Sequence, residues 1–149
     1  MELRASFEGV EKQVDTYFKV PAGRLKLREI AGGGSELIFY RRDEAAARRD
    51  CAYEIATIPD PSKLKDVLVS ALRVDVRVAK TREVYRLAGV KINLDEVHGL
   101  GGFIEFEVRV QGNDFDGADS KVKELMKRFG IGAGDALCCS YSDMVRKAG

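Results

Sequence analysis

Charged and apolar residues alternate along Gly23–Glu29, which reads GRLKLRE. Successive side chains of a β-strand point to opposite faces, so this segment is expected to be a strand. One face would be apolar, and the other would carry Arg24, Lys26 and Arg28 in a row. Like charges aligned on one strand repel each other, so this strand raises the question of what faces its three cations.

Strand patterns recur along the chain, and helical patterns interrupt them. Turn residues separate the first three strands, and Asp60-Pro61 indicates a helix start that is followed by apolar residues at helical spacing. The predicted strands are Gln13–Val20, Gly23–Ile30, Ser35–Arg42, Ala52–Ile58, Val74–Leu87, Val90–Val97 and Phe103–Gln111. The predicted helices are Pro61–Leu72, Gly117–Phe129 and a short one within Cys139–Lys147. We therefore expect an α+β chain dominated by antiparallel strands, with residues 1–149 in one domain.

Cations and carboxylates are concentrated on different predicted strands. Cations lie on the early strands and at Lys80 and Arg82, whereas carboxylates lie at Asp95, Glu105 and Glu107. Each strand alone fits a sheet with one solvated face. If the sheet curls into a barrel, the polar faces could line a bore with a cationic and an acidic wall. Arg and Lys suit phosphate oxygens and carboxylates suit Mg²⁺, so a metal-bound polyphosphate would satisfy both walls.

The composition argues against several other classes. With 25 basic and 24 acidic residues the formal net charge is +1, so we expect no general electrostatic attraction to a nucleic acid polymer or a membrane. No apolar run is long enough to span a bilayer, and no signal peptide is expected. The chain has three cysteines, two of which are adjacent, so they are poorly suited to forming disulfides. This favours a reducing, cytoplasmic location. The single histidine, His98, excludes a multi-histidine metal site.

Several blocks of the sequence resemble the CYTH superfamily of triphosphate tunnel enzymes, most of all its class IV adenylate cyclase-like branch. The blocks are Gln13–Phe18, Gly23–Arg28, Tyr40–Arg42, Lys80–Arg82, Ile92–Asp95, Gly99–Glu107 and Ser140–Asp143. The resemblance implies an antiparallel β-barrel with flanking helices, which forms a tunnel for a triphosphate small molecule. It also implies a divalent cation, Mg²⁺ or Mn²⁺. The chain is expected to be a monomer or a homodimer.

The same resemblance implies roles for individual residues. The phosphate ligands would be Arg24, Lys26, Arg28, Arg42, Lys80, Arg82 and Lys91. The metal ligands would be Asp95, Glu105 and Glu107, and the catalytic residues would be Lys26, Arg28, Glu105 and Glu107. Family activities include the cyclisation of ATP to cyclic AMP and the hydrolysis of thiamine triphosphate or inorganic triphosphate.

The chain departs from the family pattern at three places. Family members usually open with a strand bearing E-x-E-x-K and then a helix, but here only Glu2–Ala5 precedes the Gln13 strand by a few residues. Either Glu2-x-Arg4 is a reduced remnant of that motif or Met1–Gly9 is the end of the helix, so the first strand is expected to be missing or reduced and the first helix to be absent. Asn93 stands where members often carry histidine, and Lys91 replaces the usual arginine. Three functions stay open: a cyclase-like or triphosphatase enzyme, a non-catalytic polyphosphate- or nucleotide-binding module, and a domain whose charged faces are merely solvated.

Overall fold

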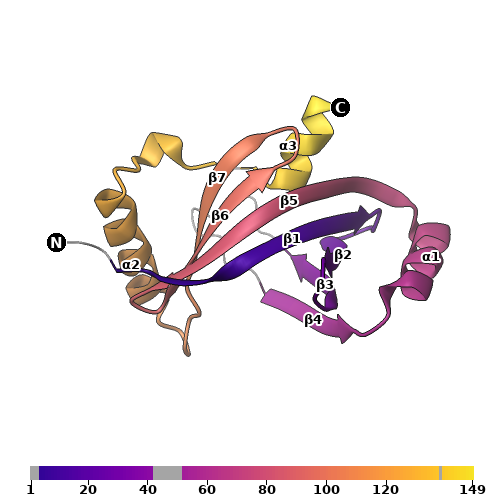
Figure 1. Ribbon diagram of the computed structural model, residues 1–149, viewed down its shortest axis with the longest axis horizontal. Helices are drawn as coiled ribbons and strands as arrows, with labels where there is room; N and C mark the ends of the chain where they lie inside the picture. Colours follow the sequence, from indigo (N-terminus) through magenta and orange to yellow (C-terminus); the bar gives the residue numbers. More distant parts are fainter. Residues whose placement is uncertain (1–3, 42–51, 138) are drawn as a thin grey trace. The chain divides into compact units, whose positions relative to one another are not determined.

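The computed structural model describes residues 4–41, 52–137 and 139–149, and its strands form one seven-stranded sheet (Figure 1). The strands are β1 (Ser6–Phe18), β2 (Arg24–Ile30), β3 (Ser35–Arg41), β4 (Ala52–Ile58), β5 (Val74–Leu87), β6 (Val90–Val97) and β7 (Gly101–Glu107). The helices are α1 (Pro61–Leu72), α2 (Phe115–Arg128) and α3 (Tyr141–Ala148), with a short 3₁₀ helix at Ala133–Asp135. The hydrogen-bonding order is β4-β3-β2-β1-β5-β6-β7.

The expected α+β fold with an antiparallel sheet is confirmed. The pairs β1–β2, β2–β3, β3–β4 and β6–β7 are all antiparallel. Among the described residues, β4 and β7 stand at the two ends of the order, so hydrogen bonding between strands does not close the sheet. Alternation along a strand predicts its two faces but carries no information on whether the outermost strands meet.

Four predicted elements have the expected bounds, and the first strand differs most. It begins at Ser6 instead of Gln13, and no helix precedes it in the described residues. Its early part is polar, but it is held to β5 by the tilted ring contact of Phe7 with Tyr85, whose centroids are 5.2 Å apart. Long-range pairing therefore extends a strand that local composition does not indicate. The last strand is shorter than expected, since β7 ends at Glu107.

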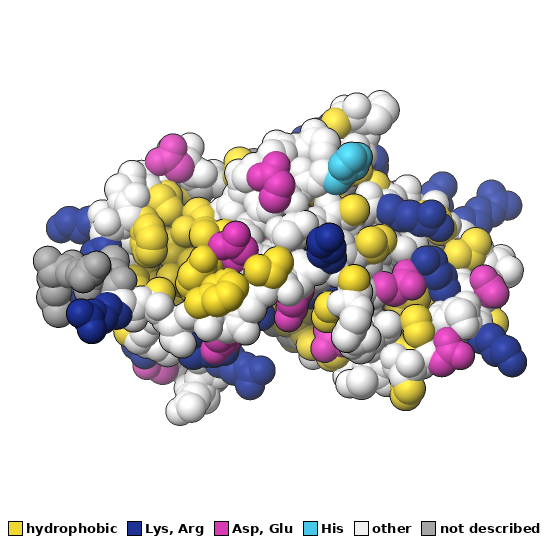
Figure 2. All heavy atoms as spheres, in the orientation of Figure 1, with side chains coloured by type: hydrophobic (Ala, Val, Ile, Leu, Met, Phe, Trp, Pro, Cys, Tyr) yellow, Lys and Arg dark blue, Asp and Glu magenta, His cyan; other side chains and the backbone are white. Residues whose placement is uncertain are grey.

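The chain divides into two compact units, and β1 and β5 contribute to both. The β6–β7 unit comprises Met1–Glu11 and Thr81–Ser140. The β2–β4 unit comprises Lys12–Lys80 and Tyr141–Gly149. On the face drawn in Figure 2, basic and acidic side chains are interspersed. None of the described helices is both long enough and apolar enough to cross a membrane.

The core of the β6–β7 unit lies between its hairpin and α2. Buried Val90, Ile92 and Leu125 form its centre. Partly buried side chains pack around them, namely Tyr85, Leu87, Ile104, Phe106 and Val108. Because alternate side chains of a strand point to opposite faces, the apolar face of β6 packs here and its polar face is directed away from this core.

In the β2–β4 unit, a tight turn fixes the register of β1 on β2. Gly23 has a φ of 70°, and a Cβ there would lie 2.7 Å from the Phe39 ring, so this turn requires glycine. The resulting register pairs Tyr17 with Lys26 and places Asp15 opposite Arg28. The polar face of β2 is thereby set beside an acidic residue of β1.

Candidate functional site

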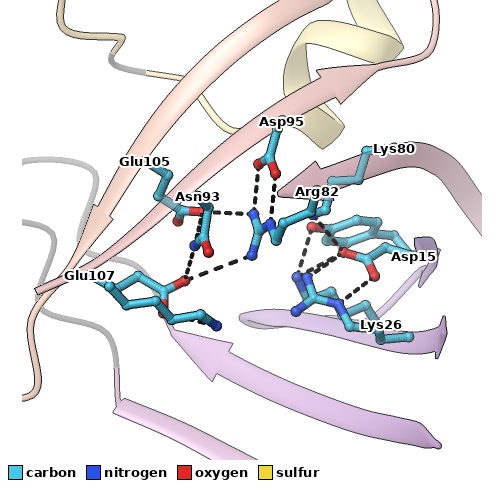
Figure 3. Close-up of polar contacts among 11 residues, drawn as sticks. Asp15, Lys26, Lys80, Arg82, Asn93, Asp95, Glu105 and Glu107 are labelled. Carbon is cyan, nitrogen blue, oxygen red and sulfur yellow. Dashed lines mark hydrogen bonds and ion pairs between the residues drawn. The ribbon is translucent and has the colours of Figure 1, made fainter. Parts of the chain in front are cut away.

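Three cations of the β2–β4 unit converge on one carboxylate, as the labelled side chains of Figure 3 show in part. Arg28 donates hydrogen bonds from Nε and Nη2 to the two oxygens of Asp15, both at 2.8 Å. Lys26 Nζ donates to Asp15 Oδ2 at 3.1 Å, and Lys80 Nζ lies 3.6 Å from the same oxygen. We call Asp15, Lys26, Arg28 and Lys80 the cation cluster.

The carboxylate at the centre of the cation cluster is buried, because Asp15 is 1% exposed. Burial alone would raise the pKa of Asp15, since it disfavours the charged form. The hydrogen bonds from Arg28 and the charges of Lys26 and Lys80 outweigh it and hold the pKa far below its ordinary range. Asp15 is therefore ionised at neutral pH and is shared by three cations.

Two tyrosines flank Lys26 in the same unit. The Lys26 Nζ lies 5.5 Å from the centroid of the Tyr17 ring and 5.6 Å from that of Tyr40. Cations are attracted to aromatic faces at this range. Burial raises the pKa of both phenols, so both stay protonated at neutral pH and can donate hydrogen bonds. The tyrosines thus add ring faces and hydroxyl donors to the cation cluster.

Helix α3 contributes to the surroundings of the cation cluster. Arg24 Nη2 lies 3.0 Å from Asp143 Oδ1, and the Lys80 Nζ lies 5.3 Å from the centroid of the Tyr141 ring. Arg24 also lines a pocket of about 300 Å³ together with Tyr17. The outermost cation of β2 is therefore paired with α3, while the two inner ones face Asp15.

A second polar cluster, in the β6–β7 unit, has Arg82 at its centre (Figure 3). Arg82 donates from Nε and Nη2 to the two oxygens of Asp95, both at 2.7 Å. Its Nη2 also donates to Glu105 Oε2 at 2.8 Å, and its Nη1 lies 3.8 Å from Glu107 Oε1. We call Arg82, Asn93, Asp95, Glu105 and Glu107 the carboxylate cluster.

Arg82 and Asp95 form a buried bidentate pair, with side chains 4% and 0% exposed. Burial alone would lower the pKa of Arg82, but the hydrogen bonds to Asp95 and the charges of the two glutamates raise it, so the guanidinium stays charged. Arg82, expected as a phosphate ligand, binds carboxylates in this unit. Asp95, expected as a metal ligand, has both oxygens hydrogen-bonded to Arg82.

The two glutamates are the accessible part of the carboxylate cluster, since each side chain is 44% exposed. Asn93 is fully buried beside them, and its Nδ2 donates to Glu107 Oε1 at 3.0 Å and to Glu105 Oε2 at 3.4 Å. Its Oδ1 is buried without a hydrogen-bond partner among the described residues. Lys91, another expected phosphate ligand, lies with its Nζ 3.8 Å from Glu107 Oε2.

The carboxylate cluster fits a divalent cation only in part. Within the described residues, no three His, Cys, Asp or Glu side chains are arranged to hold a metal ion. Glu105 and Glu107 offer exposed carboxylates of the kind that Mg²⁺ prefers. Asp95 does not fit this role because Arg82 occupies it. The glutamate pair suits a cation that takes its remaining ligands from water and phosphate oxygens.

The predicted phosphate ligands thus separate into several groups. Lys26, Arg28 and Lys80 meet at Asp15. Arg42 lies outside the described residues. Asp15, Tyr17 and Tyr40 lie in this site although no role was predicted for them from the sequence. Asp15 and Tyr17 are two residues apart on the strand that precedes the three cations, so they share one face of that strand. This spacing is the sequence feature from which a role for Asp15 could have been predicted.

Stability in acid is expected to depend on Asp15. Its pKa is lowered by folding, so its contribution is complete above the ordinary value of about 4 and is lost as the pH falls below it. An Asp15→Asn variant should be less stable than the unsubstituted protein at pH 7, and this difference should shrink between pH 5 and pH 2, roughly. Urea denaturation across this range measures it, and a difference independent of pH would contradict the expectation.

Comparisons with known proteins cover most of the chain. The CYTH domain model matches residues 1–136, whereas a search of curated proteins finds no match. A protein from Pyrococcus horikoshii is 23% identical with a TM-score of 0.87, covering 95% of this chain and 86% of its own. A conserved hypothetical protein from Pyrococcus furiosus is 25% identical with a TM-score of 0.87, at 96% and 88% coverage. A proposed adenylate cyclase from Vibrio parahaemolyticus is 21% identical with a TM-score of 0.77, at 97% and 84% coverage.

Proposed function

The chain belongs to the CYTH domain family, and from that premise we propose that it binds a triphosphate-containing small molecule with a divalent metal ion and acts on the phosphate chain. The observation that carries this proposal is the convergence of Lys26, Arg28 and Lys80 on one carboxylate. Three cations so close together suit a ligand with several negative charges. Arginine in particular binds phosphate through the same paired N–H groups that bind a carboxylate.

The carboxylate cluster supports the metal part of the proposal. Glu105 and Glu107 would hold Mg²⁺ or Mn²⁺, and the bound cation would neutralise charge on phosphate oxygens. Asn93 would orient the two carboxylates through its amide N–H groups. Phosphate oxygens match the chemistry of the cation cluster, and a divalent cation matches that of the two glutamates.

The cation cluster would act on the charge that develops during phosphoryl transfer. In hydrolysis, water forms a bond to the γ-phosphorus as the bond to the β–γ bridging oxygen breaks. In cyclisation, the ribose 3′-hydroxyl attacks the α-phosphorus and pyrophosphate leaves. Arg28 and Lys26 would stabilise the charge on the phosphate oxygens in either case, and the Tyr17 and Tyr40 hydroxyls can donate to them.

Product analysis tests the proposal and separates the two reactions. The protein is incubated with ATP, thiamine triphosphate or tripolyphosphate, with Mg²⁺ or Mn²⁺. Orthophosphate indicates hydrolysis, and cyclic AMP with pyrophosphate indicates cyclisation. No product from any substrate with either metal would overturn the enzymatic part of the proposal. No binding of any of them in calorimetry would overturn the whole.

The metal role of the glutamates can be measured without turnover. Glu105→Gln combined with Glu107→Gln should weaken Mn²⁺ binding by about tenfold or more, because Mn²⁺ loses two charged oxygen ligands. The electron paramagnetic resonance signal of free Mn²⁺ reports the affinity. Glu124→Gln, on α2 and paired with Arg128, is the matched control and should bind as the unsubstituted protein does. Equal affinities in all three proteins would place the metal elsewhere.

A non-catalytic binding module is the second candidate, and one observation favours it. Asp95 is held by Arg82, which leaves two glutamates where three metal-binding carboxylates were expected. A module of this kind would bind tripolyphosphate in calorimetry and give no product with either metal. Turnover of any triphosphate would exclude it.

A further inference from the structure

We propose that the Asp15 carboxylate occupies the phosphate-binding position formed by Lys26, Arg28 and Lys80 when no ligand is bound. A phosphate group of the ligand takes this position on binding. The inference rests on the proposed binding of phosphate by the cation cluster. It assigns Asp15 a role in setting ligand affinity, beyond that of an ion-pair partner in the core.

The contacts of Asp15 reproduce those that a bound phosphate would make. Both of its oxygens accept from the guanidinium of Arg28 at 2.8 Å, and one of them also accepts from Lys26 at 3.1 Å. Arginine binds carboxylates and phosphates through the same fork of two parallel N–H groups. An incoming phosphate and Asp15 would therefore compete for the same donors.

Asp15 serves several cations at once. Asp15 lies within ion-pair distance of three cations, whose side chains are 3–15% exposed. Gathering buried cations is unfavourable unless an anion stabilises them. Asp15 supplies that anion when no ligand is bound.

The same carboxylate must weaken ligand binding. A phosphate that approaches Lys26 and Arg28 is repelled by the negative charge of Asp15, which is buried and poorly screened by salt. Asp15 thus stabilises the empty protein and lowers its affinity for phosphate. Removing the charge of Asp15 should therefore lower the stability of the empty protein and raise its affinity for phosphate. If Asp15 were only a structural ion-pair partner, its removal would not have these opposite effects.

Thermal denaturation with and without tripolyphosphate tests the inference. Asp15→Asn should lower the melting temperature without ligand by about 6–20 °C, as expected for a broken buried ion pair. Tripolyphosphate should then raise the melting temperature of Asp15→Asn by more than it raises that of the unsubstituted protein, because it replaces the missing charge. Glu29→Gln is the matched control, since Glu29 pairs with Lys65 and lies one residue from Arg28. Its ligand-induced shift should equal that of the unsubstituted protein.

A second pair of variants covers the case in which Asp15→Asn does not fold. Lys80→Met keeps Asp15 with two cations, and Lys80→Met with Asp15→Asn keeps the same cations without the carboxylate. The double variant should show the larger shift with tripolyphosphate. The inference is wrong if removal of Asp15 leaves the ligand-induced shift unchanged or reduces it while the unsubstituted protein still responds. If neither the unsubstituted protein nor any variant responds, the cation cluster does not bind phosphate, and the proposed function fails with the inference.

Discussion

Replacing Arg82 with methionine should lower the free energy of unfolding by about 3–5 kcal/mol, the range for removing one partner of a buried ion pair. The substitution leaves the Asp95 carboxylate, whose side chain is 0% exposed, without its bidentate partner. It also removes the 2.8 Å hydrogen bond to Glu105. Urea denaturation at pH 7 measures the loss, which appears as a lower midpoint with little change in slope.

A second substitution identifies the cause of that loss. Adding Asp95→Leu to Arg82→Met removes the uncompensated charge and should recover most of the stability, because apolar replacements of buried ion pairs are often neutral or better. Lys91→Met is the control at a partly exposed ion pair, since Lys91 lies 3.8 Å from Glu107 and its side chain is 33% exposed. It should change the stability by about 1 kcal/mol or less. A double variant as unstable as Arg82→Met would rule out the buried charge of Asp95 as the cause.

Replacing Arg28 with alanine should weaken the binding of tripolyphosphate about 100-fold. Arg28 supplies the fork of N–H donors in the cation cluster, and two charge-assisted hydrogen bonds account for a loss of this order. The change also leaves Asp15 with fewer cations, so that its charge repels the ligand more strongly. Isothermal titration calorimetry at constant ionic strength measures the affinity.

The control for this variant removes a cation of the same unit outside the cluster. Lys65 lies on α1 and pairs with Glu29 at 2.7 Å, so Lys65→Gln changes the net charge equally. Its affinity for tripolyphosphate should stay within about twofold of the unsubstituted protein, as its charge is partly exposed and screened. If Arg28→Ala and Lys65→Gln bind equally well, phosphate is bound elsewhere and only the general charge of the unit matters.

Much of the fold could be predicted because its signals are local. Asp60 and Pro61 mark the start of α1, whose bounds agree with the prediction. The same holds for β4, β5 and β6, where the strand patterns are bounded by clear turns or helix signals. The early half of β1 was not predicted, since its polar side chains are held by pairing with the distant β5. The Arg86 Nε, for example, donates to Glu8 Oε1 at 2.7 Å.

The alternation of residues in the sequence was enough to separate the polar from the apolar faces of β2, β6 and β7. It placed Lys26 with Arg28 and Glu105 with Glu107, because the two-residue period of a strand depends on the backbone alone. Which carboxylate faces which cation was decided by the tertiary structure. Asp15 meets Arg28 through the register of one hairpin, and Arg82 meets Asp95 across separate strands. Strand order and register bring together residues far apart in the chain, so local pattern could identify the charged residues but not their partners.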